Sequence, residues 1–359
     1  MSLAPYDAVL LVSYGGPEGP DDVLPFLRNA TAGRGIPDAR LTEVGAHYAL
    51  FGGVSPINAR NAELAGALAA ELGRRGAPVP IVVGNRNWHP YLAEALRDLD
   101  AAGARRVACV ITSAYASYSG CRQYREDLAA ALAESGAEIA LDKIGPYAES
   151  PGFVAANADA VADALRRLPG ARVLFVTHSI PEAMDAASGP GGEAGRYRAQ
   201  HLRVADAVAR AAGEAVAAEE VEWELVFCSR SGPPQVPWLT PDVNDRLAEL
   251  AAEGVRSVVL APIGFVNDHM EVVYDLDTQA AATASGVGIE VVRAATAGTH
   301  PAFVGALCDA LLDRAAVARG ERPGPAGPGA PCSASCCLPG RPGPLRPAAC
   351  SASGDPMER

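Results

Sequence analysis

The amino-acid sequence predicts an α/β protein with two similar domains, each built on a parallel sheet of about four strands. Short apolar segments rich in β-branched residues alternate with amphipathic helical patterns, which is typical of a doubly wound parallel sheet. The alternation restarts after about residue 145, so the 359 residues divide into two units of the same pattern. In such folds the loops after the carboxyl ends of the strands are where functional side chains are expected.

In the first half, the expected strands are almost entirely apolar, as in a sheet that is buried on both faces. They span residues 9–13, 81–83, 107–112 and 138–144. The helical patterns of this half span residues 21–30, 37–50, 57–73, 90–102 and 122–135. Each strand is followed by a loop that contains Gly, Ser, Asn or Tyr, and these loops are expected to meet at one edge of the sheet.

The second half repeats the pattern of elements, although no sequence repeat is visible. Its expected strands span residues 173–177, 225–228, 256–261 and 289–292. Its helical patterns span residues 151–168, 196–218, 241–253 and 301–318. A further helix is expected to begin at about residue 269, shortly after the third of these strands. The strand ends of the two halves are then expected to face a shared cleft.

The segment PIGFVNDHMEVVYDLD is the most informative one in the chain. Its helix is expected to be capped by Asn267 or Asp268. Glu271 and Asp275 are four residues apart on that helix, so they lie on one face. Like charges at this spacing destabilise a helix, which suggests that the two carboxylates serve a site. Asp268, His269 and Glu271 also sit together at the turn that opens the helix. A solvated acidic face is the alternative, but the apolar neighbours favour a chemical site.

His178 directly follows the strand at 173–177, in the half that also carries Glu271. A histidine in such a place is often a core or capping residue. Its position at the carboxyl end of a parallel strand nevertheless favours a functional role. An imidazole that faces a carboxylate across a cleft can bind a divalent transition metal or take protons from a substrate nitrogen. His178 and Glu271 are therefore the candidate catalytic and metal-binding residues.

The loops expected at the cleft are rich in Tyr, Ser and Gly, which suits a flat ligand. Gly lets the backbone approach such a ligand closely, and Tyr offers both a π face and a hydroxyl group. The Tyr and Ser residues concerned are Tyr14, Ser55, Tyr115, Tyr118 and Tyr124. No segment fits the GxGxxG or P-loop patterns of nucleotide binding, and GxSxG, HExxH and CxxC are also absent.

Composition narrows the classes of partner. The net charge of −12 argues against nucleic acid and against an anionic membrane surface. The N-terminal segment has no basic region before its short apolar run, so a strand is expected there and not a signal peptide. No apolar stretch reaches the length of a membrane span. A soluble, cytoplasmic, monomeric protein without a stable membrane anchor is therefore expected.

Half of the eight cysteines crowd into a C-terminal tail, residues 319–359, that is rich in Pro and Gly. They are Cys332, Cys336, Cys337 and Cys350. Such a tail cannot bury a core and would be disordered on its own. In a cytoplasmic chain, a group of cysteines suggests metal or iron–sulfur ligation before it suggests disulfides. Binding through these cysteines would order the tail, and free thiols in a disordered tail are the alternative.

Six segments, in chain order, closely resemble the ferrochelatase family, and most of all its soluble bacterial coproporphyrin III members. They are SYGGPEGPDDVLPFLRN, HYALFGGVSPIN, GNRNWHPY, THSIP, SRSGPPQVPWL and PIGFVNDHMEVVYDLD. The resemblance covers about residues 5–318. It implies two flavodoxin-like, Rossmann-like domains of chelatase type, over 5–145 and 146–318, with a porphyrin in the cleft. It also implies a lyase that inserts Fe²⁺ into coproporphyrin III in haem biosynthesis.

The same resemblance implies roles for individual residues. His178 matches the family's metal-binding and proton-accepting histidine, and Glu271 matches its carboxylate partner. Tyr14 matches a tyrosine that, in soluble members, lies on the opposite porphyrin face and can coordinate the iron. Ser55 and Tyr124 match positions that bind the tetrapyrrole and its carboxylates.

Two positions depart from the family pattern. Gln279 stands where the acidic ladder of the helix would continue one turn beyond Asp275. The arginine that soluble members often use near the first loop is absent at Thr31 and Ala32, and Arg34 follows just beyond. An iron relay beyond Asp275 and a propionate contact in the first loop are therefore less well supported.

Some ferrochelatases bind a [2Fe–2S] cluster through one internal and three C-terminal cysteines, so the resemblance implies this cofactor. Cys121 lies where the internal ligand is expected. Cys332, Cys336 and Cys337 are the closest-spaced cysteines of the tail, and Cys350 is left over. A set of four thiolates suits an iron–sulfur cluster or Zn²⁺, and the spacing fits no standard zinc pattern.

Other activities stay open beside the insertion of iron into coproporphyrin III. One is insertion into protoporphyrin IX, which is disfavoured because the chain lacks an apolar, membrane-facing lip. Another is the insertion of a different metal, such as cobalt, into a related ring. The last is a non-catalytic haem or porphyrin carrier with Tyr14 and His178 as axial ligands, which would not need Glu271 and Asp275 behind the histidine.

Overall fold

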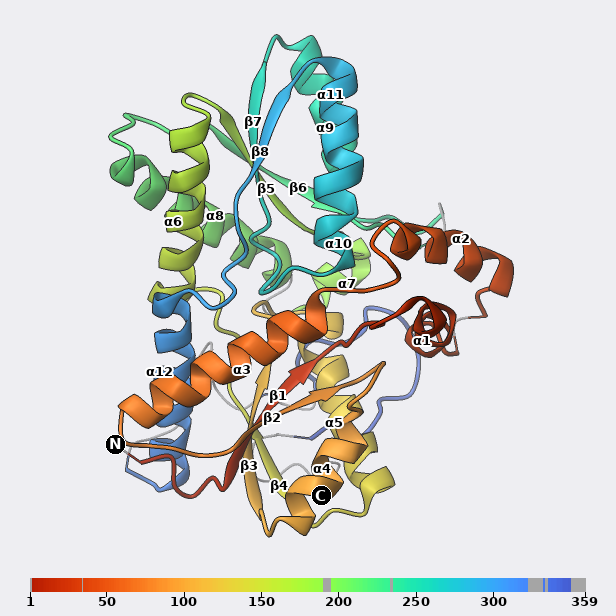
Figure 1. Cartoon of the computed structure of the whole chain (residues 1–359), viewed down its shortest axis with the longest axis vertical. Helices are drawn as coiled ribbons and strands as arrows, with labels where there is room; N and C mark the ends of the chain where they lie inside the picture. Colours follow the sequence, from red (N-terminus) through yellow and green to blue (C-terminus); the bar gives the residue numbers. More distant parts are fainter. Residues whose placement is uncertain are drawn as a thin grey trace.

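The computed structural model describes residues 2–33, 35–189, 195–232, 235–321, 332 and 335–349. Within these residues the chain forms two four-stranded parallel sheets, ordered β2-β1-β3-β4 and β6-β5-β7-β8. The strands are β1 (Ala8–Ser13), β2 (Ile81–Asn85), β3 (Arg106–Ile111), β4 (Ala140–Lys143), β5 (Arg172–His178), β6 (Trp223–Cys228), β7 (Ser257–Ala261) and β8 (Glu290–Arg293). Both sheets have the same topology, so the predicted α/β fold with two similar halves is confirmed (Figure 1).

Helices cover both faces of each sheet (Figure 1), as a doubly wound fold requires. Those of the first half are α1 (Val23–Ala30), α2 (Asp38–Ala49), α3 (Ile57–Arg74), α4 (Leu92–Ala101) and α5 (Gln123–Ser135). Those of the second half are α6 (Pro151–Arg167), α7 (Glu182–Ala186), α8 (Arg196–Ala215), α9 (Val243–Ala252), α10 (Met270–Val273), α11 (Ala281–Val287) and α12 (Pro301–Ala318). No helix in the described ranges is both long and apolar enough to cross a bilayer. The cytoplasmic location and the monomeric state stay predictions.

The single helix expected from about residue 269 is interrupted. A π-helical segment, Asp275–Ala280, separates α10 from α11. The backbone N–H of Gln279 donates to the carbonyl oxygen of Tyr274 (2.8 Å), five residues earlier, as in a π-helix. Short π segments inside helices are frequent at functional sites. The 3.6-residue pattern of the sequence carries no sign of this break.

The two halves share one hydrophobic core. A single cluster of buried side chains runs from the inner face of the first sheet to that of the second, through α3, α6, α8 and α12. Its members include Leu11, Leu68, Phe153, Phe175 and Phe303. The outer faces of the sheets have separate clusters, one beneath α4 and α5 and one beneath α9 and α11. Continuous apolar packing therefore holds the two sheets in a defined relative position.

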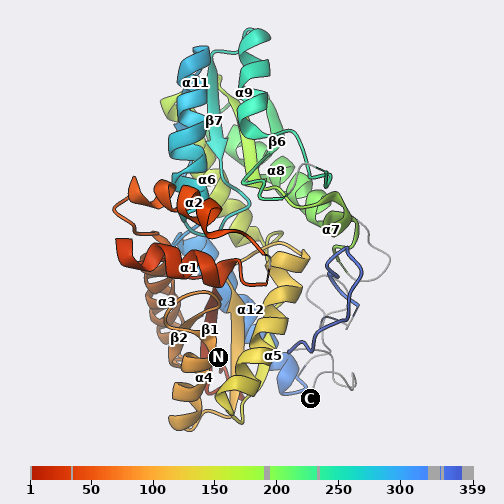
Figure 2. The same cartoon turned by 90° about the vertical axis from the view of Figure 1, so that its right-hand side faces the viewer.

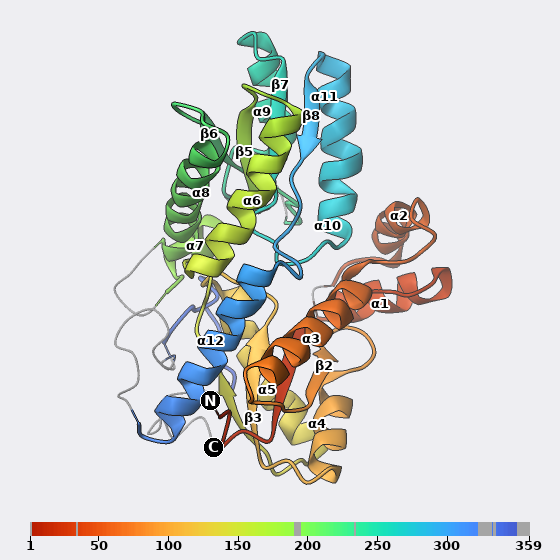
Figure 3. The same ribbon diagram turned by 60° about the vertical axis from the view of Figure 1, so that its left-hand side comes forward.

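The last helix, α12, ties the two halves together. It lies along α6 and along α3, which belongs to the first half (Figure 3). Arg75, at the end of α3, pairs with Asp309 of α12 (2.5 Å). Arg314 of α12 pairs with Asp142 of β4 (2.6 Å). Domain limits at 145 and 318 therefore stay a prediction, because α12 contacts both halves.

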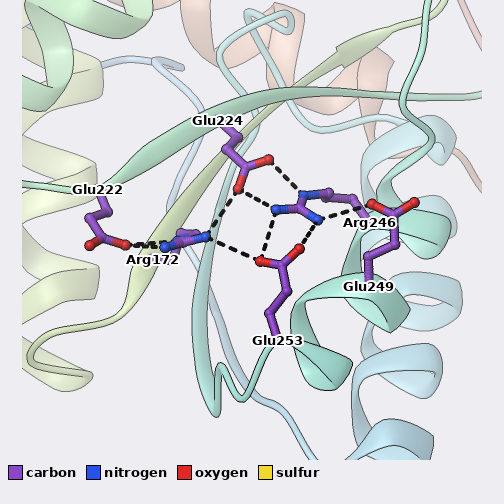
Figure 4. Close-up of polar contacts among 6 residues, drawn as sticks. All are labelled: Arg172, Glu222, Glu224, Arg246, Glu249 and Glu253. Atoms are coloured by element: carbon purple, nitrogen blue, oxygen red, sulfur yellow. Dashed lines mark hydrogen bonds and ion pairs between the residues drawn. The ribbon is translucent and has the colours of Figure 1, made fainter.

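An ionic network joins β5, β6 and α9 at the amino ends of the strands, at the opposite end of β5 from His178 (Figure 4). Arg246 on α9 contacts Glu224 of β6 (2.6 Å) and Glu253 (2.7 Å). Arg172, the first residue of β5, also contacts Glu224 (3.3 Å). The network therefore fastens the amino ends of two strands to a covering helix, far from the strand ends that face the cleft.

Candidate functional site

His178 is the last residue of β5, so it lies at the carboxyl end of a central strand of the second sheet. Its Nε2 lies 3.3 Å from Oε1 of Glu271 on α10. Its Nδ1 donates to the carbonyl oxygen of Ser179, which orients the ring. The side chains of His178 and Glu271 are 29% and 45% exposed, so a ligand in the cleft can reach both. The structure thus brings the two candidate catalytic residues together.

A glycine places the segment that carries Glu271 beside β5. A Cβ atom on Gly264 would lie 2.1 Å from Oγ1 of Thr177, so only glycine permits this close approach. The backbone N–H of Gly264 donates to the carbonyl oxygen of Val176 (3.1 Å). The loop after β7 is therefore bound to β5 directly next to His178, and α10 begins within reach of the imidazole.

The ion pair determines the protonation of both partners. Burial by itself would lower the pKa of His178, but the charge of Glu271 and the hydrogen bond to it raise that pKa to about 9. Burial would raise the pKa of Glu271, but the charge of His178 and the same hydrogen bond lower it to about 2. In the absence of a ligand, the pair is therefore an imidazolium and a carboxylate at neutral pH.

A second carboxylate lies behind the pair. Asp275 is the first residue of the π-helical segment, and the hydroxyl of Ser229 donates to its Oδ2. Burial, together with the charge of Glu271, raises the pKa of Asp275 to about 6. Glu271 and Asp275, which the sequence analysis grouped, therefore both interact electrostatically with His178. The pKa of Asp275 is higher than that of Glu271.

One expectation for the loop before α10 is wrong. The helix is capped by His269, whose Nδ1 accepts from the backbone N–H of Glu271 (3.2 Å), and not by Asn267 or Asp268. Asp268 pairs with Arg293 (3.0 Å), and Nδ1 of His269 lies 3.8 Å from Oε2 of Glu271. The local sequence favours Asn and Asp as caps, but each finds a tertiary partner here that local sequence cannot reveal.

Tyr14 approaches the same region from the first half of the chain. It directly follows β1, is 38% exposed, and meets the ring of Phe26 edge to face (6.2 Å). Tyr48 on α2 packs against Phe26 edge to face (6.1 Å), and burial, together with the charge of Glu271, raises the pKa of Tyr48 well above the usual range. Sequence reasoning missed Tyr48, because it stands inside a helix and not after a strand.

The helix α2 also contacts the second half of the molecule. The imidazole of His47 stacks on the ring of Tyr274, directly after α10, with 3.9 Å between ring centroids. Figure 1 shows α2 beside α10 at the level where the two halves meet. α2 of the first half and the segment after α10 of the second half are therefore in direct contact.

Arg86 is a second site residue that sequence reasoning missed. Its guanidinium lies 5.7 Å from the centre of the Tyr14 ring and 4.9 Å from that of Tyr124. It also pairs with Asp127 (3.0 Å). Tyr124 is only 5% exposed, and its burial raises its pKa well above the usual range. Arg86 directly follows β2, so the rule that functional residues follow strands could have found it.

Ser55 lies at the base of the same region. It is 5% exposed, and its backbone N–H donates to the carbonyl oxygen of Pro17 (2.9 Å). A Cβ atom on Gly16 would lie 2.6 Å from the Cβ of Ser55, so the loop after β1 touches Ser55 only because Gly16 lacks a side chain. Ser55 is therefore held next to the Tyr14 loop, while Arg34, named for the first loop, lies outside the described residues.

A second candidate site lies on the side of α5 and α7. Cys121, Cys336 and Cys337 form a small buried cluster, and Cys332 packs against it. Hydrogen bonds from Cys121 and Cys336 lower the pKa of the Cys332 thiol. No group of three or more His, Cys, Asp or Glu side chains in the described ranges is arranged to hold a single metal ion. Cys350 lies outside these ranges.

The described part of the tail binds both halves of the molecule. Ala349 exchanges hydrogen bonds with Arg125 of α5: its N–H donates to the Arg125 carbonyl (2.9 Å), and its own carbonyl accepts from Nε (2.8 Å). The backbone N–H of Cys337 donates to the carbonyl oxygen of Gly189, just beyond α7 (3.0 Å). Figure 2 shows residues 335–349 beside α5 and below α7. The tail therefore spans from the first half to the segment that follows His178.

Comparison with known proteins covers most of the chain. A family model described as Ferrochelatase matches residues 6–315. A protein of Streptomyces griseus named coproporphyrin III ferrochelatase is 55% identical over 89% of this chain and 88% of its own length. A protein of Streptomyces coelicolor with the same name is 50% identical over 98% of both chains. The family resemblance found in the sequence is confirmed.

The solved structure of SirB from Bacillus subtilis with Fe³⁺ has a similar fold. It aligns with a TM-score of 0.51 at 15% identity and covers 88% of this chain and 97% of that one. At this identity the likeness concerns the fold only. The match to the family model over nearly the whole folded region, and relatives at half identity along most of their length, establish that the chain belongs to the ferrochelatase family.

Proposed function

We propose that this protein is a lyase that inserts Fe²⁺ into coproporphyrin III and forms coproheme in haem biosynthesis. The observation that carries the proposal is the pair of His178 and Glu271, whose facing atoms lie 3.3 Å apart at an accessible position after β5. Membership of the ferrochelatase family supports the reaction, and the name of the two Streptomyces relatives supports the substrate.

The reaction has a geometric difficulty that the fold can resolve. In a flat porphyrin the nitrogen lone pairs lie in the ring plane and the N–H protons occupy the centre. Bending the ring exposes a lone pair to metal on one face and an N–H to a base on the other. A rigid cleft can supply this distortion from the energy of binding the rest of the ring. The hydrophobic core shared by the two halves is the source of that rigidity.

The site residues then have distinct roles. His178 and Glu271 act on one face of the ring, as the metal site and the proton acceptor. Tyr14 acts on the other face and can coordinate the iron. Asp275, held by Ser229, provides a second carboxylate for protons that leave the ring. A porphyrin carrier would have no use for two carboxylates behind a histidine, which favours the enzyme.

The carboxylates of the substrate need polar partners at the rim of the cleft. Arg86 is a cation beside Tyr14, and a guanidinium matches the geometry of a carboxylate. Ser55 offers a hydroxyl at the base of the same loop. We infer that Ser55 and Arg86 bind the propionates of the substrate. The ring of Tyr124 lies against the guanidinium of Arg86 and holds it in position.

An anaerobic insertion assay tests the function. Fe²⁺ and coproporphyrin III are expected to give coproheme, with protoporphyrin IX and Co²⁺ as slower alternatives. His178→Ala is expected to abolish insertion while porphyrin binding persists, because the loops and the core that shape the cleft remain. A protein that binds porphyrin but inserts neither metal is a carrier, and faster reaction with protoporphyrin IX or Co²⁺ would identify one of the other chelatases.

We further propose that Cys121, Cys332, Cys336 and Cys337 hold a [2Fe–2S] cluster. The residue types fit, since four cysteine side chains pack together and thiolates are the ligands of such clusters. Cys337 has a φ of 56°, which residues other than glycine rarely adopt, so the tail is held in a constrained form. When bound, the cluster would supply covalent iron–thiolate links between the tail and Cys121, in the segment Tyr118–Arg122 that precedes α5.

Analysis of iron and acid-labile sulfide in protein purified without oxygen tests the cluster. Cys121→Ser is expected to remove the visible absorption and to make the tail sensitive to protease, and loss of Cys332, Cys336 or Cys337 is expected to do the same. Cys109→Ser serves as a control, because Cys109 is buried inside β3 and belongs to a different hydrophobic cluster from the other four thiols. Absence of sulfide from the unaltered protein would contradict the proposal.

A further inference from the structure

A short chain of polar side chains connects the two loops that line the site. Asn61 on α3 donates from Nδ2 to Oγ of Ser13, the last residue of β1 (2.6 Å). Asn267, in the loop between β7 and α10, donates from Nδ2 to Oδ1 of Asn61 (2.8 Å). The chain therefore begins one residue before Tyr14 and ends four residues before Glu271. It runs from the first half of the molecule into the second.

All three members are shielded from solvent. Ser13 and Asn61 are 0% exposed, and Asn267 is 4% exposed. A buried amide without a partner destabilises a protein, so each hydrogen bond in this chain matters. Oδ1 of Asn267 has no hydrogen-bond partner within the described residues. The bond to Asn61 is therefore the side-chain hydrogen bond that holds the amide of Asn267 in place.

Packing alone does not explain an asparagine at position 61. The buried face of α3 is otherwise lined by Ile57, Leu64, Leu68 and Leu72, at helical spacing. Position 61 falls on this face, where leucine would bury more apolar surface. A polar residue at a core position favours one specific arrangement over others of similar packing. Here the arrangement specified is that of two loops from different halves of the molecule.

We propose that Asn61 and Asn267 are positioning residues for metal insertion, which set the separation between the Tyr14 loop and the Glu271 loop. This inference rests on the proposed function, in which the macrocycle lies between Tyr14 on one face and Glu271 on the other. The ring must meet groups on both faces at once, so the rate depends on their separation. Asn61 is fully buried and Asn267 is almost fully buried, so both act through the loops they join.

Two substitutions test the link. Asn267→Ala removes the bond across the halves but leaves Asn61 bonded to Ser13. It is expected to lower kcat for Fe²⁺ insertion into coproporphyrin III about tenfold or more, while the Kd for the porphyrin changes less than about threefold. Asn61→Leu keeps the branched shape of the side chain, removes both hydrogen bonds, and is expected to have the same effect.

The spectrum of the bound product gives a second readout. Tyr14 reaches the iron only if its loop is correctly placed, so the absorption spectrum of ferric coproheme bound to Asn267→Ala is expected to differ from that of the unaltered protein. A merely structural loss would lower the melting temperature without changing this spectrum. The split between kcat and Kd and the spectrum therefore both report on position and not on stability.

Asn157→Ala is the matched control. Asn157 is also a buried asparagine, but its Nδ2 donates to the Phe153 carbonyl of its own helix (2.8 Å) and joins no loops of the site. It is expected to lose stability and to retain kcat. If Asn61→Leu and Asn267→Ala also retain kcat and the product spectrum at a temperature where all variants are folded, the proposal is wrong. Absence of insertion by the unaltered protein would instead overturn the proposed function, and this inference with it.

Discussion

The charge of Glu271 determines the state of His178, since the carboxylate raises the pKa of the imidazole to about 9 against the effect of burial. Glu271→Gln keeps the size of the side chain and removes this charge. We expect insertion to slow by a factor of about 10² or more, because a proton acceptor next to the ring is lost, with porphyrin binding changed only a few-fold. Steady-state kinetics and porphyrin fluorescence measure the two effects separately.

Another carboxylate beside a histidine provides the control for this substitution. Asp159 pairs with Nε2 of His300 (3.2 Å) between α6 and α12, away from the candidate site. Asp159→Asn is expected to retain the insertion rate. Equal losses of rate and of porphyrin affinity in Glu271→Gln would make Glu271 a structural residue and contradict the role assigned to it.

At the level of elements, different interactions stabilise the two ends of the strands in the second sheet. At the carboxyl ends, Gly264 lets the loop after β7 bind to β5, and at the amino ends the ionic network holds β5 and β6 against α9. Because the network lies at the opposite end of β5 from His178, its loss should weaken the fold without changing the chemistry. Stability and activity can therefore be separated within one domain.

Arg246→Ala tests this separation. The guanidinium contacts Glu224 and Glu253, and its loss leaves these carboxylates close together without the intervening cation. We expect the melting temperature to fall by about 2–4 °C, more at low salt than at high salt, with kcat unchanged. Arg210→Ala is the control, since Arg210 pairs with Asp206 on the open surface of α8 and exposed pairs of this kind contribute little. A fall in kcat in Arg246→Ala at a temperature where it is folded would show that the two ends of the strands are coupled.

At the level of the whole molecule, a buried histidine joins the two halves. His201 on α8 stacks on Tyr115 of the first half, with 3.5 Å between ring centroids. Burial lowers the pKa of His201 to about 3, so the ring is neutral. Its Nδ1 donates to the carbonyl oxygen of Tyr197 (2.8 Å), which leaves Nε2 to accept from the hydroxyl of Thr177 (2.9 Å).

This histidine predicts a loss of stability in acid. Between pH 6.5 and about 3 the unfolded chain binds a proton on His201 that the folded protein does not. The free energy of unfolding should therefore fall with pH in this window, by about 1.4 kcal/mol per unit from this residue. Denaturant unfolding at several pH values measures the slope. His201→Gln should have a shallower slope than the unaltered protein between pH 6 and 4, and equal slopes would contradict the prediction.

The class of fold and most of its elements could be predicted because they depend on local pattern. Short apolar runs such as Val9–Ser13 and Val173–Thr177 match the core strands β1 and β5 to within a residue or two. A strand buried on both faces needs an unbroken apolar run, and that requirement is visible without knowledge of its neighbours. The rule that side chains after strands face the ligand likewise pointed to His178 and Tyr14.

Errors arose where a residue's partner lies far away in the sequence. Asn267 was expected to cap α10, but it bonds to Asn61, 206 residues earlier. Asp268 was the other candidate cap, but its carboxylate pairs with Arg293. A helix cap and a long-range hydrogen bond use the same side-chain atoms, and only the folded chain decides between them.

The local chemistry of the chain is thus enough to establish its α/β class, its strand ends and the residue types at its site, because periodicity and turn residues act over a few positions. The distance between His178 and Glu271, the π-helical turn at Asp275 and the meeting of Cys121 with the tail arise only in the tertiary structure. These features depend on how separate elements pack against one shared core. That packing is a property of the whole chain, because each contact is stable only when many distant segments are already in place.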